Sequence, residues 1–205
     1  MRTGAAVGVA TDLLADPKAG VLTLFGAGEQ AADQVRAVHA VRPLQRVTVV
    51  NRHPEPVGVL FRVLRSELPD TELCVGSEVA SSVADADIIC CATPATSPLF
   101  AAAMLPKAVH VNAVGSYRPS MRELPDDLLA SSTIVVDELE AVLVESGEII
   151  HAIDAGVITT KRLVELGSAL NSAPASRSGR TVFKSVGLAM QDWAIANLLA
   201  TAFLP

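Results

Sequence analysis

The sequence contains no run of basic residues and no apolar stretch long enough to span a bilayer, because Asp, Arg, Pro or Gly interrupts each one. Its net charge is -6, so it lacks the basic surface of a nucleic-acid-binding protein. Hydrophobic residues make up 50% of the chain and charged residues 19%, which excludes intrinsic disorder as a class. We expect a globular α/β protein with neither nucleic acid nor membrane as a partner.

The sequence also lacks cysteines or histidines with the mutual spacing of a metal site. Cys74, Cys90 and Cys91 lie in apolar, strand-like runs, which favours reduced thiols in a cytoplasmic protein. His110 lies in an apolar run and is interpreted as a hydrogen-bonded core histidine. The N-terminal residues carry acidic charge and no cleavage-like end, so residues 1–16 are interpreted as a helix and not as a signal peptide.

Apolar runs of strand length alternate with helical patterns from residue 20 onward. The predicted strands are 21–25, 46–50, 71–75, 87–93, 108–114 and 133–137. The predicted helices are 30–41, 57–68 and a short one over 77–86, with Ser77 as a possible N-cap. This alternation predicts a doubly wound parallel sheet of the Rossmann type, in the strand order 3-2-1-4-5-6. Residues 172–180 are predicted to form a polar loop, and residues 181–205 a long amphipathic helix that needs a covering surface.

A glycine-rich turn, FGAGEQAA, directly follows the first predicted strand and opens a helix. Gly26, Gly28 and Ala31 have the GxGxxA spacing, which suits a tight turn, a close backbone approach to a pyrophosphate, and close helix–strand packing. The strand–turn–helix context favours a dinucleotide site over a turn that binds nothing. At the end of the second strand, Asn51-Arg52-His53 replaces the acid typical of NAD-selective domains, so we expect NADPH (NADP) to be preferred, with NAD possible.

Six motifs together resemble the ornithine cyclodeaminase/mu-crystallin family. They are RTGAA (2–6), FGAGEQAA (25–32), CATPATSPLF (91–100), VNAVGSYRPSMREL (111–124), VVDELEAVLVESGEI (135–149) and VFKSVGLAMQD (182–192). The family includes cyclodeaminases, alanine dehydrogenases, cyclic ketimine reductases and crystallins, all with a nicotinamide cofactor on the Rossmann domain. The resemblance covers nearly the whole chain, and the block from 111 to 124 is its most specific part.

The resemblance assigns roles to residues that match the family motifs. It implies that Arg2 holds a substrate carboxylate, a task suited to the bidentate guanidinium. The implied substrate-side backbone is Ser185, Val186 and Gly187. The implied cofactor-binding residues are Gly26, Gly28, Glu29, Gln30, Asn51, Arg52, His53, Ala92, Thr93, Pro94, Asn112 and Val114.

The resemblance also implies a missing part. The chain begins at the family's RT motif, so we expect an N-terminal segment of the substrate and dimerisation domain to be absent. On this hypothesis residues 1–19 link to that domain, residues 20–170 form the Rossmann domain, and residues 171–205 are a loop and helix of the dimerisation domain. A complete protein is expected to be a homodimer.

One position departs from the cyclodeaminases in the family. They carry an acidic general base two residues after the glycine of the NAVG-like motif, where this chain has Tyr117. A phenol, with a reference pKa of about 10, is a poor base at neutral pH. Asp137 and Glu148 are expected to have only structural roles, such as solvated positions or helix caps.

Three hypotheses follow from these patterns. The first is an NADPH-dependent reductase of cyclic imino acids, such as pyrroline-2-carboxylate or a ketimine. The second is ornithine cyclodeaminase, which converts ornithine to proline and ammonia with bound NAD. The third is a non-catalytic, crystallin-like or truncated NADP-binding protein. The substrate in the enzymatic cases is a small imino acid or amino acid.

Overall fold

A parallel β-sheet organises the chain in the computed structural model, which describes residues 2–172 and 179–203. All pairings between its strands are parallel. Within the described ranges the strands are β1 (Val21–Phe25), β2 (Arg46–Val50), β3 (Glu72–Val75), β4 (Ile88–Cys91), β5 (Val109–Ala113), β6 (Thr133–Val136), β7 (Leu163–Glu165) and β8 (Arg180–Lys184). The six strands predicted from the apolar runs are therefore confirmed.

The strand order is β3-β2-β1-β4-β5-β8-β6-β7. The doubly wound half from β3 to β5 agrees with the prediction, but the predicted adjacency of the fifth and sixth strands is wrong. β8 lies between them and pairs with β5 on one side and β6 on the other. Residues 181–184 were predicted to be helical, and they form most of this inserted strand. β8 therefore belongs to the sheet, although the predicted boundary at 170/171 separated it from the Rossmann domain.

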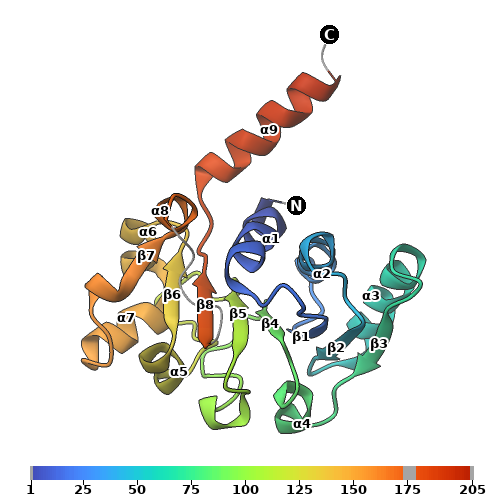
Figure 1. Ribbon diagram of the computed structural model, residues 1–205, viewed down its shortest axis with the longest axis horizontal. Coiled ribbons are helices and arrows are strands. Elements are labelled where there is room, and N and C mark those ends of the chain that lie inside the picture. Colours follow the sequence, from blue (N-terminus) through green and yellow to red (C-terminus); the bar gives the residue numbers. More distant parts are fainter. Residues whose placement is uncertain (1, 173–178, 204–205) are drawn as a thin grey trace.

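Helices cover both faces of the sheet, as Figure 1 shows. One face packs against α1 (Arg2–Leu14), α2 (Ala31–Val41), α3 (Pro54–Glu67) and α8 (Leu166–Leu170). The other packs against α4 (Val79–Val83), α5 (Asp126–Ser131), α6 (Leu139–Glu145) and α7 (Gly147–Asp154). Short 3-10 turns cover Ala102–Met104 and Thr160–Arg162.

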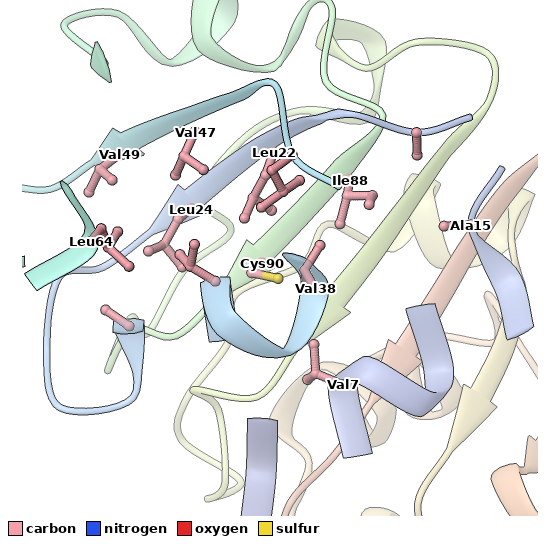
Figure 2. Packing of buried hydrophobic residues seen from close by; sticks show 14 of the residues in the cluster. Val7, Ala15, Leu22, Leu24, Val38, Val47, Val49, Leu64, Ile88 and Cys90 are labelled. Carbon is pink, nitrogen blue, oxygen red and sulfur yellow. The ribbon is translucent and has the colours of Figure 1, made fainter. Parts of the chain in front are cut away.

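The strands are apolar on both sides because each side meets a layer of helices. On the first face Leu22, Leu24 and Val47 point toward Val38 of α2 and Leu64 of α3, and all five are buried (Figure 2). This packing fixes α2 across the end of β1, and so places the glycine-rich turn at the carboxyl edge of the sheet.

Two helix starts differ from their predictions. α3 begins at Pro54, three residues before the predicted start, because proline is well suited to the first helical turn. α4 begins at Val79 with Glu78 at the N-cap position and no side-chain cap, so Ser77 is not its N-cap.

The C-terminal helix α9 (Ala189–Phe203) starts eight residues later than predicted and projects away from the sheet (Figure 1). It does not bury an apolar face against the sheet: Met190, Trp193, Leu198 and Leu199 are all exposed. Most of the predicted polar loop, residues 173–178, and the last two residues of the predicted helix lie outside the described residues. None of the described helices is long and apolar enough to cross a membrane.

Arg42 holds the C-terminal end of α1 against α2. Its side chain is 6% exposed and donates hydrogen bonds to the carbonyl oxygens of Asp12, Ala15 and Asp16, and to the Asp12 carboxylate at 2.8 Å. The last carbonyls of a helix have no partner within the helix, so these bonds complete the end of α1.

We predict that Arg42→Met lowers the free energy of unfolding by about 2–4 kcal/mol, because it leaves several inward-facing carbonyl groups without donors. Chemical denaturation followed by circular dichroism measures the change. Arg36→Met is the matched control: Arg36 pairs with two carboxylates, Asp33 and Glu67, but its side chain is 43% exposed. The control should cost less than about 1 kcal/mol. Equal losses in the two variants would contradict the role given to Arg42.

Candidate functional site

A cavity of about 580 Å³ lies at the carboxyl edge of the sheet, where the loops after β1, β4, β5 and β8 meet the start of α1. Twelve residues singled out from the sequence line it: Arg2, Gly28, Glu29, Gln30, Ala92, Thr93, Pro94, Val114, Tyr117, Ser185, Val186 and Gly187. Thr3, Gly115 and Met121 complete the lining. The fold therefore gathers residues of five distant motifs at one place.

The glycine-rich turn forms one end of this cavity. Gly26 has a φ of +95°, and a Cβ there would lie 2.5 Å from the Ala92 carbonyl oxygen, so no other residue fits. Gly28 lies on the open side: a Cβ built there has no atom within 4 Å. The turn thus leaves a backbone cradle in front of the α2 N-terminus, which suits a pyrophosphate.

The end of β2 lies beside this turn and outside the cavity lining. Asn51 accepts a hydrogen bond from the Ala27 amide at 3.2 Å and donates one to the His53 carbonyl at 2.7 Å. It therefore ties the glycine-rich turn to the β2–α3 loop. Arg52 and His53 are exposed, and Arg52 has no ion-pair partner in the part of the chain that the structure describes.

Asn112 does not reach the cavity. Its side chain is buried toward α1, where it donates to Thr11 Oγ1 at 3.0 Å and lies 3.1 Å from His110 Nε2. His110 Nδ1 lies 2.9 Å from Thr181 Oγ1, and burial lowers the pKa of His110 to about 4. His110 is accordingly a neutral core histidine, and Asn112 belongs to a polar link between the sheet and α1.

Arg2 lines the cavity from the first residue of α1. Its guanidinium pairs with Asp192 of α9 and lies 3.5 Å from the Leu188 carbonyl. The Arg2 side chain is 41% exposed, and Nη2 lies near Gly187. A guanidinium in this position can hold a carboxylate that enters the cavity.

Asp137 fixes the loop beneath Arg2. One oxygen of its carboxylate accepts hydrogen bonds from Ser185 Oγ at 2.7 Å, the Val186 amide at 3.0 Å and the Gly187 amide at 2.9 Å. The expectation of a structural role for Asp137 is therefore met, with a specific task. No local pattern predicts this contact, because Asp137 and Ser185 are 48 positions apart.

Tyr117 lines the cavity with its side chain about half exposed, and the Arg118 guanidinium lies 5.4 Å from its ring centroid. Among the described residues that line the cavity, Glu29 is the one acid, and it belongs to the glycine-rich turn. The expected position of a general base thus carries a phenol in contact with a cation.

Two acids are buried next to residues that line the cavity or follow them in the chain. Glu123 and Glu148 are both fully buried, so Glu148 does not lie on a solvated face. Burial raises the pKa of Glu123, while Lys184 and the Thr93 amide oppose the shift. Glu123 was missed from the sequence, where it is an ordinary acid before an apolar leucine.

The thiols and metal-binding side chains add no further chemistry to the site. Cys90 and Cys91 are buried and unpaired, and burial raises the pKa of Cys90 to about 12. Over residues 2–172 and 179–203 no three His, Cys, Asp or Glu side chains gather as metal ligands would.

Comparison with known proteins places these features in one family. The model of the ornithine cyclodeaminase/mu-crystallin family matches residues 1–203. The chain is 39% identical over 204 residues to a Delta(1)-pyrroline-2-carboxylate reductase of Bacillus cereus, covering 97% of this chain and 62% of that protein. It is 34% identical over 199 residues to the ketimine reductase mu-crystallin of Mus musculus, covering 97% of this chain and 60% of that one.

Solved structures agree with these relatives. The Thermococcus litoralis Delta(1)-pyrroline-2-carboxylate reductase in complex with NADH and L-proline superposes with a TM-score of 0.91 and 33% identity, over 96% of this chain and 62% of that one. The iminosuccinate reductase of Paracoccus denitrificans in complex with NAD⁺ gives a TM-score of 0.90 and 32% identity, over 98% and 62%. This chain spans about 62% of the length of the first relatives. The chain belongs to the ornithine cyclodeaminase/mu-crystallin family.

Proposed function

We propose that the protein is an NADPH-dependent reductase of cyclic imino acids. The observation that carries the proposal is the cavity itself, whose lining combines the glycine-rich turn, which suits a pyrophosphate, with Arg2 and the non-acidic Tyr117. The relatives named as pyrroline-2-carboxylate and ketimine reductases support the same activity.

Different residues around the cavity would bind the cofactor and the substrate. The backbone at Gly26 and Gly28 would hold the pyrophosphate, and the loops after β4 and β5 would receive the nicotinamide, which supplies the hydride. Arg2 would grip the substrate carboxylate and so orient the imine carbon. An imine substrate can arrive already protonated, so this reaction needs no carboxylate at position 117.

A preference for NADPH over NADH is part of the proposal. Arg52 is exposed beside the ribose end of the expected cofactor site, forms no ion pair within the described ranges, and has no acid beside it at position 51 or 53. A guanidinium can pair with a 2′-phosphate, whereas an acid there would hold the ribose hydroxyls. The two neighbouring structures contain NADH and NAD⁺, so the choice between cofactors rests on Arg52.

We predict that Arg52→Asp reverses this preference, weakening NADPH binding by about tenfold or more, which is roughly 1.4 kcal/mol. Fluorescence titration with NADPH and NADH measures both affinities. Arg62→Asp, which makes the same charge change on the exposed side of α3, is the control and should leave the ratio unchanged. Tighter binding of NADH by the unmodified chain would reject the proposal.

Ornithine cyclodeaminase is the second candidate, because a probable ornithine cyclodeaminase from Bordetella pertussis superposes with a TM-score of 0.84 and 32% identity. Tyr117 argues against it, since the cavity lining offers no acid at the expected position of the base. The third hypothesis is a non-catalytic NADP-binding protein, since the chain spans only about 62% of the length of its relatives.

We predict that the protein oxidises NADPH when given pyrroline-2-carboxylate and releases no ammonia from ornithine. Arg2→Ala should lower kcat/KM for the imine, and the loss should correspond to about 2–4 kcal/mol of transition-state stabilisation, because the substrate carboxylate loses its partner. Arg2→Lys, which keeps the charge without the fork, should lose less. Parallel assays of NADPH oxidation and ammonia release measure both reactions. Rapid ammonia release from ornithine would overturn the interpretation of Tyr117.

We also propose a homodimer, supported by the exposed apolar side chains Met190, Trp193, Leu198 and Leu199 of α9. A neighbouring archaeal alanine dehydrogenase, 28% identical, is described as a dimer. We predict that sedimentation of the protein detects self-association, and that Trp193→Glu with Leu198→Glu weakens it. A monomer at all concentrations would reject the prediction. The cytoplasmic location and the domain boundaries remain predictions.

A further inference from the structure

Glu123 is a fully buried acid to which the proposed reaction assigns no role. Its Oε1 accepts hydrogen bonds from the Thr93 amide at 2.7 Å and from Thr93 Oγ1 at 2.8 Å. Its Oε2 accepts hydrogen bonds from the Gly115 amide at 2.8 Å and the Ser116 amide at 3.1 Å. Every partner is a donor, and each carboxylate oxygen accepts two hydrogen bonds, which suits an acceptor with two lone pairs on each oxygen.

These donors belong to two different loops. Thr93 follows β4 and Gly115 follows β5, and both residues line the cavity. The two strands are neighbours in the sheet, and their backbone pairing ends with the bond from the Val114 amide to the Cys91 carbonyl at 2.9 Å. Beyond that bond, the Glu123 carboxylate links the loop after β4 to the loop after β5.

The loops are also pressed together at this point. A Cβ on Gly115 would overlap the Thr93 backbone and lie 2.6 Å from Glu123 Oε1. The separation of the two loops is thus set within a narrow range by the carboxylate on one side and by the bare glycine on the other.

Burial and the neighbouring Glu148 raise the pKa of Glu123, whereas Lys184 and the hydrogen bonds from Thr93 favour its ionised form. Lys184, at the end of β8, is fully buried, donates to the Ser116 carbonyl and lies 3.2 Å from the Glu148 carboxylate. Lys184 contacts both Ser116, whose amide donates to Glu123, and Glu148. Buried carboxylates persist when donors and a cation compensate them, and both are present here.

We propose that Glu123 is a positioning residue: its carboxylate holds the Thr93 and Gly115 loops at the separation that admits the nicotinamide and the imine between them. The identity of the molecules that enter the cavity rests on the proposed function. The link between the two loops does not, because it is seen in the hydrogen bonds of Glu123. Glu123 does not line the cavity, so it would act through Thr93, Gly115 and Ser116, to which it is hydrogen-bonded.

The test is Glu123→Gln, which keeps the size of the side chain and replaces one acceptor oxygen by a donor NH₂ group. That group must face either Thr93 or the pair of amides at 115 and 116, so one loop loses its acceptor. Amide exchange followed by NMR should rise at least tenfold at one of the two loops and stay unchanged in the central strand β1.

Function is measured on the same variant. We expect kcat for imine reduction to fall about 10- to 100-fold, the scale of an error of about 1 Å in positioning. Binding of 2′,5′-ADP, which reports only the adenosine end, should stay within threefold of the unmodified protein. Glu123→Asp, which keeps the charge, should recover part of kcat, and it serves as the test variant if Glu123→Gln does not fold.

The outcomes separate the two proposals. Unchanged amide exchange and unchanged kcat in a folded Glu123→Gln would overturn the positioning role. Equal losses of 2′,5′-ADP binding and kcat would also overturn it, because they indicate a general loss of structure. Faster exchange at the loops of a protein that reduces no imine, before or after substitution, would support the link between the loops and reject the proposed function.

Discussion

The parallel pairing of β1 with both β2 and β4 is the constraint on which the rest of the structure depends. The chain leaves β1 toward β2 and returns later to β4 on the other side, so the loops at the two carboxyl ends diverge and open a crevice between them. The Gly26 turn can lie against Ala92 only because β1 and β4 are adjacent and in register. Each later part of the cavity is added to this crevice, from β5, β8 and α1.

Much of the first half of the fold could be predicted because its signals are local. Continuous apolar runs such as 21–25 and 46–50 need helices on both faces, and the glycines between them fix where a turn must form. The position of β8 could not be predicted in this way. Residues 180–184 contain only two apolar residues, Val182 and Phe183, and a longer apolar segment follows, so periodicity alone does not separate a short buried strand from the start of a helix here. Its place between β5 and β6 depends on contacts with residues about 45 to 75 positions earlier.

The candidate site divides in the same manner. Backbone positions such as Gly28 and Gly187 follow from motifs, because a turn at a strand end puts its own atoms at the edge of the sheet. The side chain of Asn112 illustrates the limit: in a strand buried on both faces, sequence alternation does not tell which face a polar residue takes, and this one faces α1. The contacts of Glu123 and Asp137 were not recognised because most of their partners are backbone amides, which are the same at every position and leave no trace in composition.

The placement of these acids bears on the chemistry that the cavity can support. Glu123 and Asp137 lie behind the lining and spend their lone pairs on backbone amides and hydroxyl groups of the chain itself. A carboxylate whose oxygens already accept several hydrogen bonds has little capacity left to take a proton from a substrate. The acids therefore give the site its shape, while Arg2 offers the positive charge that faces the cavity. A site built in this way suits a substrate that brings its own carboxylate and its own iminium proton, and it suits poorly a reaction that must begin by removing a proton from an amino group.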